Sequence, residues 1–396
     1  MLSTKQKNEL LKMMVEALEL PDSAYEKAKK RYEDMGEYLG REDSTLKDYE
    51  LFIFPQGSFR LGTAIRPLSE NEEYDLDLGC KLKVGISKRS YTQCDLKTMV
   101  GQELESYQIA RGIKTPKKEK HRCWRLEYQD DLSFHMDIVP CIPSDKTQKN
   151  TVYQNLMNEG LNDYLATKIG DSSISITDNR DENYHEISDN WNISNPEGYA
   201  QWFVSIMKPN NTILNERAEV DKIPDYKLKT TLQRVVQLLK RHRDNMFKND
   251  EDRKPISIII TTLVARSYKG EEDISIALTN ILNDMKNHVN PNIPRVPNPV
   301  NKEEDFSDKW TIDKYRYLDL EGNFWRWLEQ AQMDFKLILD SSSSKFISEQ
   351  IESKFSLQLN EQKVTESVGL VVVKTFSPKE YSIKKENVAT PHMDIK

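Results

Sequence analysis

The chain has 396 residues, enough for two regions that each form a hydrophobic core, and its 37% hydrophobic and 31% charged residues are ordinary for a globular protein. No apolar run reaches the length that spans a bilayer, and the first residues lack the apolar segment of a signal peptide, so we expect a cytoplasmic protein with no membrane partner. The net charge of −7 disfavours a protein that binds duplex nucleic acid through its phosphates, because such binding normally needs a basic stripe on the protein surface.

The N-terminal region is predicted to be helical. Apolar residues recur at helical spacing over residues 4–38, with a break at Pro21-Asp22, and we expect a long scaffold helix that runs behind a sheet. The apolar run over residues 51–54 then predicts a short strand that leads into Gln56-Gly57-Ser58. A glycine lets the backbone approach phosphate oxygens, and a serine at a helix start can donate to them. These three residues are candidate nucleotide-binding residues.

The next strand is predicted at Tyr74-Asp-Leu-Asp-Leu78. Side chains alternate along a strand, so Asp75 and Asp77 share one face while the two leucines point into a core. Two carboxylates on one face form an oxygen site that suits Mg²⁺. Surface acids on an edge strand would explain this tripeptide if it stood alone. The Gly-Ser pair just upstream favours the metal site.

A third carboxylate is predicted on a neighbouring strand. Residues 132–140 alternate well, and they place His135 and Asp137 on the polar face. The alternating residues 123–128 precede them, and residues 129–131 have the composition of a hairpin turn. An ordinary solvent-facing acid is the alternative interpretation of Asp137. Residues 114–125 form the densest basic patch, which we interpret as a solvated hairpin.

From residue 151 onward the pattern changes to helices and polar loops. Apolar residues at helical spacing, or in a long apolar run, predict further helices. Clusters of Ser, Asp and Asn predict loops. The expected elements are a helix over 155–168, an exposed crossing over 170–193, helices from 194, over 227–247 and over 255–268, a helix over 346–355, a late strand over 369–373 and a mobile tail from 378.

Several of these motifs together resemble a known family. The pattern from Gln56 to Arg66, then Glu73-Tyr-Asp-Leu-Asp77, then Met136-Asp-Ile-Val-Pro140, is similar to the bacterial cGAS/DncV-like nucleotidyltransferases. The resemblance spans roughly residues 5–335 and includes weaker matches at residues 194–203, 238–242, 254–257 and 298–301. Members of this family make cyclic oligonucleotide second messengers in the anti-phage systems called CBASS. The Gly-Ser pair with three aspartates is shared by the whole polymerase-β-like superfamily.

The resemblance implies an α+β fold. It would consist of a polymerase-β-like nucleotidyltransferase core, with a mixed twisted sheet and a long scaffold helix, plus a helical C-terminal lobe. On this basis we expect the core lobe over residues 1–160, an inter-lobe crossing over 161–200, the helical lobe that completes the nucleotide pocket over 201–375, and a flexible tail over 376–396.

The resemblance also implies roles for particular residues. Asp75, Asp77 and Asp137 would hold two Mg²⁺ ions, with Mn²⁺ as a substitute, about 4 Å apart. Lys240 matches the position of a lysine that binds the triphosphate, and Ser257 would donate to a phosphate oxygen. A solvated basic helix face and a simple helix cap are the alternative interpretations of Lys240 and Ser257. We interpret His135 as a neighbour of the site, not as a catalyst.

The predicted function is therefore a cyclic oligonucleotide synthase. It would use ATP and a second NTP to make a cyclic dinucleotide-type messenger without duplex nucleic acid, and the resemblance leaves open an operon-encoded effector or a ubiquitin-like conjugation partner. Two other functions compete with it. An RNA-tailing or tRNA-end nucleotidyltransferase would need a basic RNA track, which an acidic chain disfavours. A non-catalytic, antitoxin-like nucleotide-binding protein would not need all three aspartates.

Overall fold

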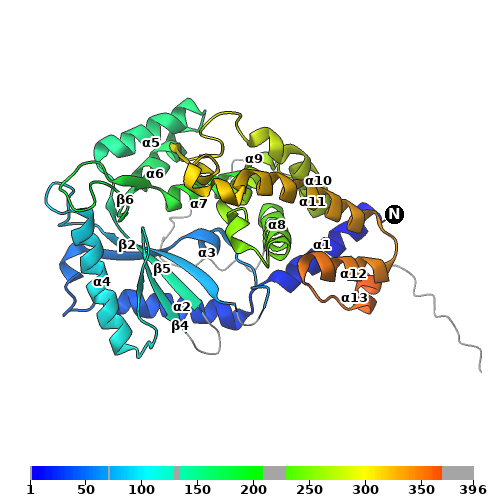
Figure 1. Ribbon diagram of the computed structural model, residues 1–396, viewed down its shortest axis with the longest axis horizontal. Coiled ribbons are helices and arrows are strands. Elements are labelled where there is room, and N and C mark those ends of the chain that lie inside the picture. Colours follow the sequence, from blue (N-terminus) through cyan, green and yellow to red (C-terminus); the bar gives the residue numbers. More distant parts are fainter. Residues whose placement is uncertain (1, 70–71, 129–133, 208–228, 368–396) are drawn as a thin grey trace, which may run out of the picture.

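A mixed β-sheet occupies one half of the molecule, and a group of helices occupies the other half (Figure 1). The computed structural model describes residues 2–69, 72–128, 134–207 and 229–367. The strands are β1 (Leu51–Pro55), β2 (Tyr74–Leu82), β3 (Lys118–Glu119), β4 (Trp124–Tyr128), β5 (Phe134–Pro143), β6 (Ile174–Ile176), β7 (Asn192–Ser194), β8 (Pro297–Asn298) and β9 (Asn301–Asp305). The helices are α1 (Thr4–Leu18), α2 (Asp22–Leu39), α3 (Gly57–Leu61), α4 (Gln93–Ala110), α5 (Lys146–Asn158), α6 (Asp163–Asp171), α7 (Pro196–Met207), α8 (Thr231–Met246), α9 (Ser257–Ser267), α10 (Ile274–Asp284), α11 (Leu320–Asp340), α12 (Ser344–Phe355) and α13 (Glu361–Ser367).

The large sheet has the strand order β1-β2-β5-β4-β3, and β6 and β7 extend it from the far end of β5. Strands β2 and β5 are parallel, while the other neighbours in this sheet are antiparallel. The first part of β5 pairs with β4 and its last residues pair with β6. Strand β5 is therefore held on both sides, and it places its polar face next to that of β2.

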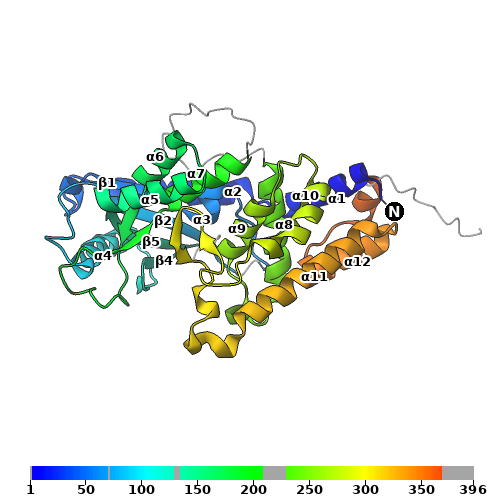
Figure 2. The same cartoon turned by 90° about the horizontal axis from the view of Figure 1, so that it is seen from above.

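Strands β2 and β5 have the alternation that the sequence predicts. Leu76, Leu78, Met136 and Ile138 are fully buried in one core, whereas the aspartates between them point to the opposite face. The core residues pack with apolar side chains of α2 and α4, and these helices lie beside the sheet in both views (Figure 1, Figure 2). The two helices therefore cover the apolar face and leave the aspartates on the opposite face of the sheet.

The break predicted at Pro21-Asp22 is confirmed, and it divides the expected long scaffold helix into two helices. Pro21 precedes Asp22 as the cap of α2, and its extended backbone separates α1 from α2. Only α2 packs against the sheet, through side chains such as Ala28 and Met35. Helix α1 instead contributes Leu10, Leu11, Met14 and Leu18 to the core of the helical half, so the N-terminal residues are divided between the two cores.

The boundary between the two cores also does not fall at residue 160. Val152 and Leu156 of α5 and Ile169 of α6 are buried with α7 to α12 in the core of the helical half. The helix expected over 155–168 is interrupted between α5 and α6, because Gly160 has a left-handed φ of +82° and Asn162 caps α6 by accepting from the Leu165 amide. The expectation of one continuous helix was therefore wrong.

Residues 170–193 are not an exposed crossing throughout. Residues Ile174–Ile176 form the buried strand β6, and the hydroxyls of Ser173 and Ser175 have partners. Ser173 Oγ donates to the carbonyl of Gly170 at 2.7 Å, and Ser175 Oγ donates to Gln148 Oε1 at 2.9 Å. The polar composition that predicted a loop therefore belongs in part to a strand whose hydroxyls are satisfied inside the protein.

Other predicted helices are confirmed, and their ends differ from the predicted ends by about one helical turn at most. These are α7, which Asn195 caps by accepting from the Gly198 amide at 2.9 Å, and helices α8, α9 and α12. The predicted turn over 129–131, strand over 369–373 and tail from 376 lie outside the described residues. No helix in the described ranges is both long and apolar enough to cross a membrane.

Candidate active site

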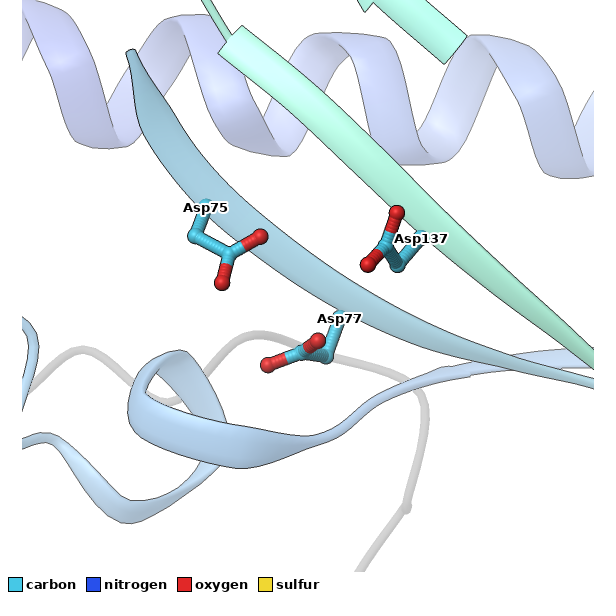
Figure 3. A group of neighbouring side chains, drawn as sticks. All are labelled: Asp75, Asp77 and Asp137. Carbon is cyan, nitrogen blue, oxygen red and sulfur yellow. The ribbon is translucent and has the colours of Figure 1, made fainter. Parts of the chain in front are cut away.

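Three carboxylates converge on the polar face of β2 and β5 (Figure 3). The parallel register places Asp77 directly opposite Asp137 and places Asp75 opposite His135. One carboxylate oxygen of each aspartate lies within 4.8 Å of the others. The structure therefore brings together the three aspartates that the sequence singled out, although they come from two strands that are about 60 residues apart in the chain.

The electrostatics of this cluster suit a divalent cation. Burial, together with the neighbouring charges of Asp75 and Asp137, raises the pKa of Asp77 to about 7. The ionised form of Asp77 is thus disfavoured until a positive charge arrives. Hard cations such as Mg²⁺ prefer clustered carboxylate oxygens of this kind, so the donor set fits the predicted metal.

Two basic side chains contact these aspartates: His135, which was predicted as a neighbour of the site, and Arg125, which was not placed there. The guanidinium of Arg125 on β4 donates to both oxygens of Asp137, from Nε at 2.6 Å and from Nη2 at 2.7 Å. A hydrogen bond of 2.8 Å joins His135 Nε2 to Asp75 Oδ1, and one of 2.9 Å joins His135 Nδ1 to Glu73 Oε2. Burial alone would raise the pKa of Asp75, but the His135 hydrogen bond and nearby positive charges lower it overall.

Gly57 lies against Asp77. It has a left-handed φ of +57°, and a Cβ atom at this position would stand only 2.2 Å from Asp77 Oδ2. The backbone amide of Gln56 donates to the carbonyl of Asp77 at 2.8 Å, so the start of α3 is fixed to β2. The side-chain nitrogen of Gln56 is buried near Gly79. Only glycine allows the turn and the close approach at residue 57.

Lys240 and Ser257 reach the site less directly. Lys240 Nζ donates to the carbonyl of Thr63, in the loop that follows α3, at 2.9 Å. Burial and the charge of Arg243 lower the pKa of Lys240 to about 8, while the charges of Asp75 and Asp77 oppose that change. Ser257 Oγ accepts from Arg243 Nη1 at 2.7 Å. Lys240 is thus part of the surroundings of the carboxylates, and Ser257 is linked to α8 through Arg243.

The basic patch over residues 114–125 is more than the solvated hairpin that we expected. Lys117 pairs with Glu105, Lys118 with Glu127, and Arg122 with Asp178. Arg125 is directed at Asp137, as described above. Because four of its cations already face carboxylates, this hairpin does not form a free basic track for nucleic acid.

The fold and the site together define a nucleotidyltransferase. Residues 52–141, which include all three aspartates, match the family model described as cyclic GMP-AMP synthase DncV-like, nucleotidyltransferase domain. A c-di-GMP synthase from Roseivirga ehrenbergii is 32% identical over 317 residues, which cover 78% of this chain and 74% of the relative. The chain therefore belongs to the bacterial cGAS/DncV-like nucleotidyltransferase family, as predicted.

Two further comparisons agree with this assignment. The cyclic dinucleotide synthase CdnG from Bradyrhizobium diazoefficiens is 23% identical over 74% of this chain and 67% of the relative. The structure of the B. diazoefficiens CD-NTase CdnG in complex with GTP has a TM-score of 0.60, at 16% identity over 92% of this chain and 98% of that one, and so shows the shared fold. The predicted α+β fold and the predicted class of enzyme, a nucleotidyltransferase that forms cyclic dinucleotides, are confirmed.

Proposed function

We propose that the chain joins two nucleoside triphosphates into a cyclic dinucleotide at a single site built on Asp75, Asp77 and Asp137. The observation that carries this proposal is the convergence of the three carboxylates beside Gly57 on two adjacent strands. The competing tailing enzyme and antitoxin-like protein are less well supported. The ion-paired hairpin offers no free basic track, and a module that only binds nucleotide would not need the complete triad.

The proposed mechanism assigns each residue a task. Bound Mg²⁺ would lower the pKa of the acceptor hydroxyl and neutralise the leaving pyrophosphate. Asp75, Asp77 and Asp137 would hold the metal, and Gly57 and Ser58 would offer their amides to the phosphates. Lys240 and Ser257 contribute further donors from α8 and α9. Positioning and electrostatics account for most of the acceleration, so no histidine base is required.

The product needs two successive transfers in the same pocket. The first joins the hydroxyl of one nucleotide to the α-phosphate of the other and releases pyrophosphate. The linear intermediate keeps one triphosphate, so it can turn over and present that group to the same carboxylate cluster. The second transfer releases another pyrophosphate and closes the ring, which leaves no terminal phosphate.

We further propose that ATP and a second NTP are the substrates and that the product is a second messenger in anti-phage defence in the cytoplasm. Because the similar proteins include a c-di-GMP synthase and CdnG, whose structure is a complex with GTP, GTP is the first nucleotide to test beside ATP. An operon-encoded effector or a ubiquitin-like conjugation partner would complete such a system. The acidic net charge of −7 supports activity without duplex nucleic acid.

We expect the purified protein to release a small cyclic product from NTPs and Mg²⁺ alone. Each NTP is supplied singly and in pairs, with and without duplex DNA or RNA, and after nuclease treatment of the protein. The products are then treated with phosphatase and identified by mass spectrometry. A ring should resist phosphatase, because it has no terminal phosphate.

Other products of this assay would reject the proposal. A ladder of phosphatase-sensitive linear chains would identify the tailing enzyme instead. Nucleotide binding without any product under all conditions would favour the antitoxin-like protein. Product formation only with added duplex would show that the acidic net charge was wrongly taken to indicate activity without duplex nucleic acid.

Lys240→Met is expected to weaken NTP binding about 10- to 100-fold, because loss of a charge-assisted contact costs about 1.5–3 kcal/mol. Methionine keeps the apolar stem of the buried side chain, so the unfolding midpoint should fall only slightly. Binding is measured by calorimetry with a non-hydrolysable NTP.

Lys88→Met is the matched control for this prediction. Lys88 is also buried, and it contacts Asp145, Gln148 and the carbonyl of Asp189 instead of the loop after α3. If Lys240→Met only lowers stability, as the control should, Lys240 is a structural residue and its proposed contact with the triphosphate is wrong.

A further inference from the structure

The loop that follows α3 is buried but has no regular secondary structure. Gly62, Thr63 and Ala64 are buried, and the loop continues to Pro67 without a helix or strand. Buried backbone carbonyls need hydrogen-bond donors, and an irregular loop cannot supply them from its own backbone. The donors for this loop must therefore come from another element.

One face of α8 supplies those donors. Lys229 lies just before α8, and the other four side chains lie within the helix. Their spacing of three or four residues, with one adjacent pair, places them on one face of the helix. Each donates to a backbone carbonyl of the loop or of the last residue of α3: Lys229 to Gly62 at 2.9 Å, Gln233 to Leu61 at 2.9 Å, Gln237 to Ala64 at 2.9 Å, Lys240 to Thr63 at 2.9 Å, and Arg241 to Arg66 and Pro67. We call these five side chains the donor face of α8.

Gln237 is the central member of the donor face. It is fully buried, and its Nε2 also donates to Glu19 Oε1 at 3.2 Å. Its Oε1 has no hydrogen-bond partner among the described residues. A buried amide oxygen without a partner costs stability, so an apolar side chain would usually be more stabilising than glutamine at this position. What the amide does provide is a donor aimed at the loop.

The loop is coupled in turn to the carboxylates. The amides of Gly62 and Thr63 both donate to the carbonyl of Ser58, so the loop and α3 form one hydrogen-bonded unit. At the other end of that unit, Gly57 packs against Asp77 so closely that a Cβ would overlap the carboxylate. A shift of the loop would therefore move α3 relative to Asp77.

A second contact holds α3 from the opposite side. Arg60 Nε and Nη2 donate to the two oxygens of Glu197 on α7, each at 2.9 Å, and both side chains are largely buried. Helix α3 thus sits between α7 and α8, both of which belong to the helical half (Figure 1). The position of the nucleotide-binding segment is set by the helical half as well as by the sheet.

We propose that the donor face of α8 is a positioning element of the active site, with Gln237 as a positioning residue that fixes α3 relative to Asp77. This inference rests on the proposed role of Gly57 and Asp77 in nucleotidyl transfer. The alternative is that these donors only satisfy a buried loop. In that case, losing one of them would lower stability without changing the affinity for nucleotide or the turnover rate.

The test compares Gln237→Met with Gln93→Met. Gln93 is also fully buried, and it too uses half of its amide, because its Oε1 accepts from the Asp178 amide at 2.8 Å while its Nε2 has no partner among the described residues. Both substitutions remove one bond to a backbone group, and Gln237→Met also removes the contact with Glu19, so we expect both unfolding midpoints to fall, that of Gln237→Met somewhat more. Binding of a fluorescent NTP analogue and the kcat and KM of product formation are then measured.

We expect Gln237→Met to lower kcat about 10- to 100-fold and to weaken binding of the analogue, because a small displacement of reacting groups has effects of that size. Gln93→Met should match the wild type in both measurements. Gln237→Lys, which keeps a donor of similar reach toward Ala64 and Glu19, should restore most of the activity. If Gln237→Met does not fold, Glu197→Gln tests the second attachment of α3 with the same measurements.

The outcomes separate this inference from the proposed function. Wild-type kinetics in Gln237→Met, or changes equal to those of Gln93→Met, would overturn the positioning role. A wild-type protein that makes no cyclic product would instead overturn the proposed function. In that case binding of the fluorescent analogue still decides whether Gln237 positions α3.

Discussion

The double variant Asp75→Asn, Asp77→Asn is expected to lose product formation by at least about 1,000-fold, because a bound metal contributes several kcal/mol of transition-state stabilisation. Asparagine keeps the size of each side chain but removes the negative charge that holds the metal. Product is measured by mass spectrometry after a long incubation. Retained synthesis would remove the catalytic assignment of both residues.

The single variant Asp77→Asn should not be less stable in the absence of metal. Because burial and the other two carboxylates raise the pKa of Asp77 from 3.8 to about 7, its ionised form is disfavoured in the folded protein. The ordinary carboxyl in the unfolded chain ionises at a lower pH, so the ionised carboxylate costs stability as the pH rises through this range. The amide removes that cost, and the unfolding midpoint at pH 8 should be unchanged or higher.

Metal binding gives a readout that does not depend on activity. Mg²⁺ should raise the unfolding midpoint of the wild type, since a ligand that binds only the folded state stabilises it, and should not raise that of the double variant. Asp178→Asn is the control, because Asp178 is a carboxylate in the same half of the molecule that pairs with Arg122. This control should keep the response to Mg²⁺. If Asp178→Asn also loses the rise in unfolding midpoint with Mg²⁺, that rise does not report on metal binding by the three aspartates.

Gly57→Ala is expected to reduce kcat/KM by at least about 100-fold while the protein still folds. The new Cβ would stand 2.2 Å from Asp77 Oδ2, so the carboxylate has to move away from its position beside Asp75 and Asp137. The left-handed backbone adds a cost of about 1–2 kcal/mol for a residue with a Cβ. Activity and unfolding midpoint are measured together.

Gly112→Ala separates these two effects. Gly112 has a similar φ of +63°, but no atom lies within 4 Å of the position of its Cβ. Both variants therefore carry the same kind of backbone strain, and only Gly57→Ala displaces a carboxylate. The expected pattern is a loss of activity in Gly57→Ala alone, with a loss of stability at least as large as that of Gly112→Ala. Full activity in Gly57→Ala would show that the position of Asp77 does not matter for the reaction.

Much of the candidate site could be predicted because its signals are local. The alternation in β2 and β5 places Asp75, Asp77 and Asp137 on polar faces without any knowledge of the tertiary structure. The helix that begins at Gly57 follows from the short strand before it and from the conformational freedom of glycine. These features need only neighbouring residues, so they can be read from the chain.

The partners of those residues could not be predicted in the same way. Arg125 meets Asp137 because the β4–β5 register places the two residues opposite each other, and that register depends on how two strands pair. His135 faces Asp75 for the same reason across β2 and β5. The pattern placed His135 and Asp137 on the right face but contained no information about what stands opposite them.

The sequence alone therefore determined the family, the three aspartates and the course of most helices and strands, because periodicity and short motifs are properties of neighbouring residues. Only the tertiary structure decided that α1 joins the helical core, that residues 174–176 complete the sheet, and that α8 supplies donors to the loop after α3. Burial and hydrogen-bond satisfaction decide these features, and both arise only when segments distant in the chain pack together.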